Sequence, residues 1–469
     1  MNDQPYVCVH AHFYQPPRED PFTNLIPDEA GAEPYRNWNE RILDTCYRPN
    51  AELGNYQRIS FNLGPTLSSW MASYSKDVLL KIVEEDMHNV AVNGAGNALA
   101  QPYNHTILPL SNRRDKETQI IWGIEAFRHL YGRNPQGIWL PECAVDLETL
   151  NVIAEQGIEF TILAPWQVDV PDGEATSPFR IELENGKSVI VFLYNKELSS
   201  RVSFDRQATV NADTFAEKML APAVKKNAAD SLTIIATDGE LYGHHQVFRD
   251  KFLAHLLNGS TSSRGMRITY PGLWLKNNKI TRTARIIENT SWSCHHGVDR
   301  WRDHCECSVD GAWKKPLREA FNCLAEEIDN QYEQMIRGAG GNPWKMRNRY
   351  IDVMLGKVTF VDWVKDFEIG FNEKNSVRKL EHLFRAQYER QRMFTSCGWF
   401  FDRMDRIEPQ NNISYAACAV WLMEQACRFE IPSAFYSLME KAKNVNTGLT
   451  GKNLFLKAYA KYAIHESAE

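Results

Sequence analysis

The chain has 469 residues, of which 43% are hydrophobic and 24% are charged, and its formal net charge is −6. This length exceeds that of one ordinary core, so we expect two domains or a large barrel with an appended domain. The modest negative charge and the lack of a basic run argue against nucleic acid as a partner. No stretch of about 18 apolar residues occurs, which argues against a membrane-spanning helix.

The beginning of the chain and its cysteines indicate a cytoplasmic protein. The opening sequence, MNDQPYVCVHAHFYQPP, lacks the basic segment and long apolar core of a signal peptide. The 10 cysteines are scattered through a large chain, a distribution typical of reduced thiols inside cells.

Short apolar runs predict strands, and helical patterns separate most of them. Residues 232–237 form a continuous apolar run, which favours a strand buried on both faces of a parallel sheet. The expected strands are residues 6–12, 58–63, 90–92, 137–140, 158–163, 189–194 and 232–237. Strands with helical crossovers indicate an α/β barrel. The polar residues 18–49 predict a long loop.

Helical patterns lie between the strands and then dominate the C-terminal third. Between the strands they cover residues 75–87, 118–131, 146–156 and 212–226. Later they cover residues 317–336, 377–394, 415–429 and 452–464. We therefore expect a barrel domain over residues 1–314 and an α-helical bundle domain over residues 315–469.

Polar side chains gather where three of the expected strands end, which in parallel α/β folds is where ligands bind. They are His10, His12 and Gln15 at the first strand, Glu142 at the fourth, and Asp238 and Glu240 at the last. A lone histidine in a strand is more often structural, and a single acid after a strand can cap a helix. Together, acids from the fourth and last strands would face each other across a barrel mouth, as in a carboxylate pair that flanks a glycosidic bond.

Four stretches, in the order HAHFYQPP, WLPE, TDGELYGHHQ and SWSCHHGVDRW, resemble glycoside hydrolase family 57. The stretches HFYQPPRE and SCGWFFD (residues 396–402) are similar to a poorly characterised branch of that family. The resemblance covers essentially the whole chain. It implies a (β/α)7 barrel followed by a helical bundle, and a retaining activity on α-glucans or related α-glycosides.

By position, the resemblance implies that Glu142 is the catalytic nucleophile and that Asp238 is the general acid/base. A retaining mechanism requires an acid with a raised pKa, which burial and a nearby carboxylate would supply. Glu240 is the expected neighbour and also a rival for the acid role. The residues expected to bind substrate are His10, His12, Gln15, Trp139, Glu240, His244, Trp292, His296, Arg300 and Trp301. The second family motif departs from its usual pattern, because NALAQPYNHTILPL has no glutamate before the final run.

The last motif also contains the residue types that zinc prefers. They are Cys294, His295, His296, Cys305 and Cys307. Their spacing fits no common two-pair zinc module, and the Cys305–Cys307 pair is closer than in a CxxC knuckle. We therefore interpret them as packed thiols beside a sugar cleft and expect no metal and no cofactor, with a structural zinc as the alternative.

The leading hypothesis is a retaining enzyme that acts on an oligo- or polysaccharide with α-linked glucose units. Transfer in place of hydrolysis, as in a branching enzyme or glucanotransferase, uses the same covalent intermediate. A second class is a metal-dependent polysaccharide deacetylase with His10, His12 and Asp238 as ligands. A third is a non-catalytic glycan-binding protein. The sequence fixes neither the linkage nor the oligomeric state.

Overall fold

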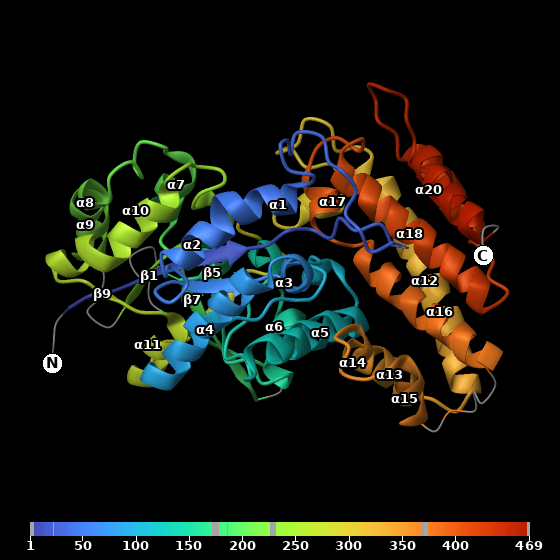
Figure 1. Ribbon diagram of the computed structural model, residues 1–469, viewed down its shortest axis with the longest axis horizontal. Coiled ribbons are helices and arrows are strands. Elements are labelled where there is room, and N and C mark those ends of the chain that lie inside the picture. The colour runs from blue at the N-terminus through green and yellow to red at the C-terminus, as the bar shows by residue number, and fades with distance from the viewer. Residues whose placement is uncertain are drawn as a thin grey trace. The chain divides into compact units, whose positions relative to one another are not determined.

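The computed structural model describes residues 4–21, 23–170, 178–184, 186–225, 231–367, 369 and 374–466, which form two compact units (Figure 1). The first unit comprises residues 1–17, 26–103 and 127–293. The second comprises residues 18–25, 104–126 and 294–469. Residues 294–314, which the sequence analysis placed with the barrel, thus group with the helical part of the chain.

Among the described residues, all the strands belong to the first unit, and the longest run in parallel at its centre. They are β1 (Tyr6–Phe13), β2 (Ser60–Leu63), β3 (Ala98–Leu99), β4 (Phe160–Leu163), β5 (Val168–Asp169), β6 (Phe179–Glu182), β7 (Ser188–Leu193), β8 (Leu232–Asp238), β9 (Arg267–Ile268) and β10 (Arg285–Ile286). In the β1–β8 pair, His12 lies opposite Asp238. This register brings two of the expected site residues to adjacent positions.

Parallel pairings connect the central segments into a ring. Strand β8 pairs with β1, β1 with β2, β2 with β3, and β4 with β7. Single parallel bridges complete the ring, and they join Ala100 to Ile138, Gly137 to Phe160, and Tyr194 to Ile234. The ring therefore consists of β1, β2, β3, residues 137–138, β4, β7 and β8, which is the arrangement expected of a (β/α)7 barrel.

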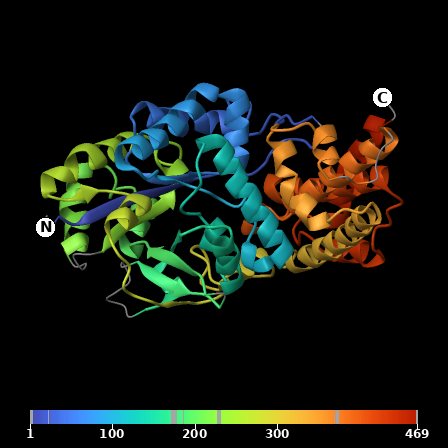
Figure 2. The same ribbon diagram turned by 90° about the horizontal axis from the view of Figure 1, so that it is seen from below.

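The helices of the first unit lie around these strands in both ribbon views (Figures 1 and 2). They are α1 (Trp38–Ile42), α2 (Arg48–Glu52), α3 (Pro65–Tyr74), α4 (Lys76–Asn93), α6 (Leu147–Glu155), α7 (Lys196–Phe204), α8 (Ala212–Phe215), α9 (Ala221–Lys225), α10 (Arg249–His255) and α11 (Pro271–Asn277). Helix α5 (Arg113–Tyr131) begins in the second unit and ends in the first. Tighter or wider helical turns occupy Leu43–Tyr47, Leu108–Leu110, Pro141–Cys143, Pro165–Gln167, Ala216–Leu220, Gly239–Leu241, Leu256–Ser260, Ser262–Arg264 and Asp299–Trp301.

Two sequence-based expectations for this unit are wrong. Residues 90–92 are not a strand but the end of α4, which closes at the left-handed Gly94 (φ 67°). The inner face of α4 is already apolar, so the exposed Val90 and Val92 can complete its last turn at little cost. Residues 38–52 are helical and not part of a loop, because the side chain of Asn37 accepts a hydrogen bond from the Glu40 amide and caps the first helix. Lys226, the expected end of another helix, lies outside the described residues.

The second unit is helical, as expected. Its helices are α12 (Lys314–Gly338), α13 (Pro343–Arg349), α14 (Ile351–Met354), α15 (Phe360–Lys365), α16 (Lys374–Arg392), α17 (Cys397–Phe400), α18 (Ile407–Ala426), α19 (Ser433–Lys441) and α20 (Gly451–Glu466). Helix α18 packs against both α16 and α20, and α12 packs against α19 (Figure 1). The long amphipathic helices bury a shared apolar core, which is the main source of helix stability in proteins.

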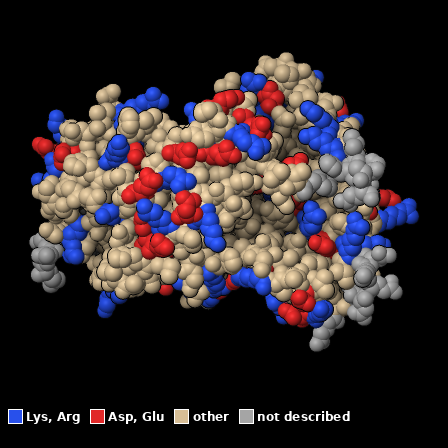
Figure 3. Space-filling view, viewed as in Figure 1, with Lys and Arg blue, Asp and Glu red and all other residues tan. Residues whose placement is uncertain are grey.

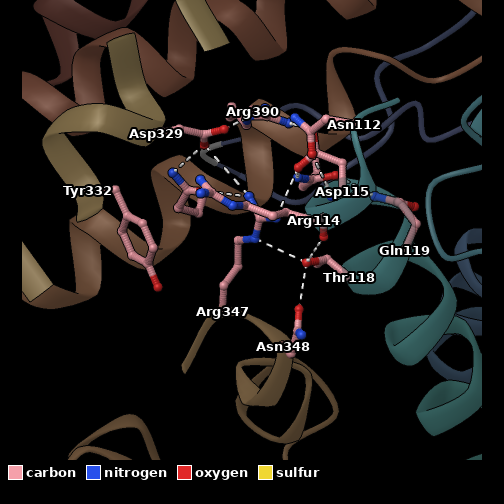
Figure 4. A network of polar contacts seen from close by, with 12 residues as sticks. Asn112, Arg114, Asp115, Thr118, Gln119, Asp329, Tyr332, Arg347, Asn348 and Arg390 are labelled. Atoms are coloured by element: carbon pink, nitrogen blue, oxygen red, sulfur yellow. Dashed lines mark hydrogen bonds and ion pairs between the residues drawn. The ribbon is translucent and has the colours of Figure 1, made fainter. Parts of the chain in front are cut away.

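A buried charge network joins α5, α12, α13 and α16 inside this unit (Figure 4). Arg347 is fully buried, with its guanidinium 3.0 Å from Asp115 and 3.7 Å from Asp329. Arg390 lies 2.7 Å from a carboxylate oxygen of each of the same two aspartates. Each charge is compensated by an opposite one, which is the condition under which buried ions are tolerated.

On the face shown in Figure 3, acidic and basic side chains are interspersed and neither sign forms a continuous stripe. In the part of the chain that the structure describes, no helix is both long enough and apolar enough to span a bilayer.

We predict that Arg347→Met lowers the free energy of unfolding by about 3–5 kcal/mol, because it leaves the two buried carboxylates of Asp115 and Asp329 with the single guanidinium of Arg390. The matched control is Arg349→Met on the same helix. Its side chain is 44% exposed and its ion pairs are longer than 3.5 Å, so a loss of less than about 1 kcal/mol is expected. Urea unfolding followed by circular dichroism measures both; equal losses would contradict the role given to the network.

Candidate active site

Glu142 lies in a sharp turn directly after the 137–138 segment of the ring. Its backbone is left-handed (φ 57°, ψ 20°), and the following residue, Cys143, also has a positive φ of 49°. Such angles are unfavourable for side chains with a Cβ atom and occur mainly where function requires them. The turn is held by the Cys143 amide, which donates to the Leu140 carbonyl, and by the Trp292 amide, which donates to the Glu142 carbonyl at 2.9 Å.

The Glu142 carboxylate is held by two side-chain donors. Its Oε2 atom accepts hydrogen bonds from Trp292 Nε1 at 3.0 Å and from Ser293 Oγ at 2.7 Å. Donors aimed at one carboxylate oxygen stabilise the charged form and fix the orientation of the group. The structure therefore presents Glu142 as an oriented carboxylate.

Asp238 is the last residue of β8; part of its surface is open to solvent, but the protein atoms of the barrel end surround its carboxyl group and reduce its hydration. Loss of hydration inside the barrel, followed by the negative charge of Glu142, raises the pKa of Asp238 to about 7. The charge that contributes to this shift is that of Glu142, whereas the sequence analysis assigned this effect to Glu240. At neutral pH, Asp238 is thus poised to give or take a proton.

Glu240 points into the protein interior and is buried. Its Oε1 atom accepts hydrogen bonds from the Tyr47 hydroxyl at 2.7 Å and from the Tyr14 amide at 3.1 Å. Burial raises the pKa of Glu240 to about 8, with the charge of Asp238 acting in the same direction against the Tyr47 hydrogen bond. These contacts make Glu240 a support for β1 and the 43–47 turn; a direct contact with substrate stays a prediction.

The close approach of β1 to the Asp238–Glu240 turn depends on the intervening glycine. A Cβ atom on Gly239 would lie 2.2 Å from the ring of Phe13, well inside van der Waals contact. Only glycine allows this turn to reach the barrel end beside Phe13.

His10 and His12 stack on the indole of Trp139, with ring centroids 4.6 and 5.2 Å apart. Burial lowers the pKa of His10 to about 3 and that of His12 to about 4, so both rings are neutral at physiological pH. His10 and Trp139 are fully buried, and the indole of Trp139 packs against the His12 ring and supports it.

His12 is oriented by its neighbours on the adjacent segments. Its Nδ1 atom lies 3.1 Å from Asn62 Oδ1, and Asn62 Nδ2 donates to Gln101 Oε1 at 2.6 Å. This chain of side chains crosses from β1 to β2 and to the residue pair beyond β3. It fixes the imidazole beside Asp238, its register partner on β8.

The remaining predicted residues of the first unit are Trp292, His244 and Gln15. Trp292 meets the edges of Trp139 and Tyr194 at 5.0 and 6.3 Å, which forms an aromatic wall beside Glu142. His244 Nδ1 lies 3.2 Å from Thr45 Oγ1, and burial lowers the pKa of His244 to about 4. Gln15 is buried, and its carbonyl accepts the Thr66 hydroxyl.

Three predicted residues belong to the second unit. Trp301 is completely buried and lies 6.1 Å from the Phe400 ring, so the expectation that its side chain binds substrate is corrected to a core role. The Arg300 guanidinium lies 4.5 Å from the same ring, and His296 lies among cysteine thiols. For Arg300 and His296, substrate binding stays a prediction.

Two of the residues that hold the carboxyl groups of Glu142 and Glu240, namely Ser293 and Tyr47, were not predicted from the sequence. Ser293 lies within the SWSCHHGVDRW stretch, so the motif marks its position but not the role of its hydroxyl as a hydrogen-bond donor. Tyr47 falls within residues 18–49, which were expected to be a loop, and nothing in its surroundings signals a carboxylate partner. Asn62 is signalled in the sequence only as one of two polar residues in β2, the other being Ser60.

The family model described as "Glycosyl hydrolase family 57" matches residues 2–271, which is more than half of the chain. The chain belongs to glycosyl hydrolase family 57. A second model, a domain of unknown function (DUF3536), matches residues 310–466. The family 57 match covers Glu142 and Asp238, whereas Trp292 and Ser293 lie beyond it.

Three relatives describe what this family 57 chain is similar to. Alpha-amylase 1 of Dictyoglomus thermophilum is 20% identical over 313 residues, which is 65% of this chain but only 43% of that protein. The maltose-forming exo-type amylase of Pyrococcus sp. ST04 has a TM-score of 0.69 at 15% identity, with 97% of this chain and 88% of that one covered. The family 57 branching enzyme of Pyrococcus horikoshii has a TM-score of 0.62 at 15% identity, with 97% and 96% covered. At these identities the solved structures show a shared fold.

We predict that Glu240→Gln makes the protein more resistant to alkaline pH. The folded-state pKa of Glu240, about 8, is above that of an exposed glutamate, so the wild-type protein loses stability as pH rises from about 4 through about 8. A glutamine still accepts from Tyr47 but carries no charge. Relative to wild type, the variant should gain on the order of 3 kcal/mol between pH 5 and pH 9.

Thermal unfolding over this pH range, with the exposed Glu52→Gln as control, measures this gain. A difference between Glu240→Gln and wild type that does not change with pH would contradict the shifted pKa.

Proposed function

We propose that this family 57 protein is a retaining glycosidase or transglycosidase of α-linked glucans, with Glu142 as nucleophile and Asp238 as general acid/base. The observation that carries the proposal is the different setting of the two carboxyl groups. Two side-chain donors hold the carboxyl group of Glu142, while loss of hydration and the Glu142 charge raise the pKa of Asp238 to about 7. Two carboxyl groups whose environments separate their pKa values are the signature of an acid and nucleophile pair.

The reaction then follows in two steps. In the first, a Glu142 oxygen forms a bond to the anomeric carbon while the glycosidic bond breaks, and Asp238 gives its proton to the leaving oxygen. In the second, Asp238 takes a proton from water or from a sugar hydroxyl, whose oxygen displaces Glu142 from the anomeric carbon. Two inversions retain the anomeric configuration.

The α-glucan substrate class is supported by the relatives, which are amylases and a branching enzyme. The partly exposed indole of Trp292 beside Glu142, backed by the buried rings of Trp139 and Tyr194, suits the apolar face of a sugar ring. Transfer is the second candidate, since a branching enzyme shares the fold over nearly its full length. Chain-length analysis of glucan products distinguishes new branch points from shortened chains.

The geometry argues against the deacetylase alternative. The Nδ1 atoms of His10 and His12 already contact Ser60 and Asn62. Within the described ranges, no set of ligand atoms from His10, His12 and Asp238 lies close enough together to hold one ion.

We predict that Glu142→Gln and Asp238→Asn each lower kcat/KM on maltooligosaccharides by at least about 100-fold. Added azide should restore turnover to glycine or alanine variants of both positions, because it is small and needs no general base. The azide product should have the inverted configuration when Glu142 is replaced and the retained one when Asp238 is replaced. The same configuration from both, or full activity of either variant, would refute the assignment.

We predict that Trp292→Phe and Ser293→Ala shift the acidic limb of the kcat/KM profile to higher pH, because each removes one donor to the Glu142 carboxylate. The alkaline limb, set by Asp238 near pH 7, should stay close to its wild-type position. The pH profiles of both variants measure this split. Trp166→Phe, which removes only a donor to the Ser291 carbonyl, is the control.

A further inference from the structure

The segment that opens the second unit holds three cysteines and one histidine in a tight group, which we name the thiol cluster. Its members are Cys294, His296, Cys305 and Cys307. Their ligand atoms all lie within 4.8 Å of one another, and it is the one such group of three or more among the residues the structure describes. The three sulfurs and the imidazole nitrogen thus enclose a common centre.

Four of the six distances between ligand atoms of the thiol cluster lie within about 0.4 Å of the edges of a tetrahedron around one metal ion. Zn–S bonds of about 2.3 Å and Zn–N bonds of about 2.0–2.1 Å require S···S edges of about 3.8 Å and S···N edges of about 3.5 Å. The observed S···S distances from Cys294 are 3.4 Å to Cys305 and 3.9 Å to Cys307. His296 Nδ1 lies 3.2 and 3.3 Å from the sulfurs of Cys305 and Cys307.

Packing alone does not account for this arrangement. A free cysteine usually behaves as a small buried apolar residue, yet Cys307 is exposed at the end of the loop. The sulfurs are also too far apart for a disulfide, which requires about 2.0 Å. Metal ligation explains both the convergence and the exposure of one thiol.

The surroundings supply the second layer of contacts that metal ligands require. His296 Nε2 lies 3.6 Å from the Glu306 carboxylate, so Nδ1 faces the sulfurs while the far side of the ring meets a carboxylate. The cations Arg300 and Lys314 lie along the same loop, with Arg300 donating to the Cys307 carbonyl and Lys314 to the Arg300 carbonyl. These two charges offset the single net negative charge of three thiolates with one Zn²⁺.

We propose that the thiol cluster binds one Zn²⁺ ion through three thiolates and His296 Nδ1, as a closed structural site. Four protein ligands leave no open position for a substrate, which separates this site from catalytic zinc. The loop needs such a link, since the single turn Asp299–Trp301 is the regular structure described between residues 294 and 313. The proposal replaces the sequence-based interpretation of packed thiols without a metal.

Metal analysis of the purified full-length chain is the first test. After growth with added zinc and gel filtration, the protein should contain about one zinc per chain. Reduced, metal-free protein titrated with Co²⁺ should develop the thiolate charge-transfer bands and intense d–d bands of tetrahedral cobalt. Zinc below about a tenth of an equivalent together with no cobalt bands would overturn the proposal.

Matched variants test the ligands one at a time. Cys305→Ser, Cys307→Ser and His296→Asn should lose most of the zinc, whereas His296→Cys should keep it because a thiolate can replace the imidazole. The controls are His295→Asn, at the neighbouring histidine, and Cys323→Ser, at a partly buried cysteine of α12. Zinc retained by all ligand variants would show an adventitious ion and overturn the proposal.

Folding is monitored separately, so that loss of metal is not confused with loss of structure. Treatment of the wild-type protein with a strong chelator should lower its melting temperature, and added Zn²⁺ should restore it. Cysteine-to-serine variants should melt at the lowered temperature with or without Zn²⁺. A melting temperature that the chelator leaves unchanged would contradict a structural role.

Discussion

The repulsion between the charges of Glu142 and Asp238 is the interaction on which the rest of the site depends. Two carboxyl groups that share one site do not readily ionise together, so their surroundings determine which one keeps the proton. Residues 292 and 293 each donate a hydrogen bond to Glu142. Asp238 lies at the barrel end, where loss of hydration favours its neutral form. Glu240 does not take part in this choice directly, because Tyr47 and the Tyr14 amide hold it in the interior.

Most of the fold could be predicted from the sequence because the barrel strands are buried on both faces and therefore read as apolar runs. The long amphipathic helices of the second unit were equally visible through their period. The error at residues 90–92 has a clear cause. Valine favours strands, but the preceding turns of α4 already bury an apolar face, so the helix can continue through Val90 and Val92. The short helices between residues 38 and 52 were hidden by polar composition, and only the Asn37 cap marks their start.

The candidate site could be predicted only in part, because the contacts that define it join residues far apart in the sequence. Motifs placed the two carboxyl groups, but their electrostatic partners come from separate segments that meet only in the folded chain. The register of β1 and β8 sets His12 opposite Asp238, and no pattern within either strand states that register. The same holds for Trp139, which was expected to bind substrate but is fully buried against the rings of His10 and His12.

The spacing of the cysteines argued against a metal, whereas their geometry in the folded chain supports the zinc proposal. The CxxC rule describes knuckles in which two ligands share one tight turn, and the pair at residues 305 and 307 does not fit it. A tetrahedral site requires only that four donor atoms converge, and a loop fixed at both ends can achieve this with other spacings. Here Asp402 accepts a hydrogen bond from Ser308, one residue after the last cysteine. At the other end, Cys294 directly follows Ser293, so an ion at the thiol cluster would restrain the chain one residue beyond a hydrogen-bond donor to the Glu142 carboxylate.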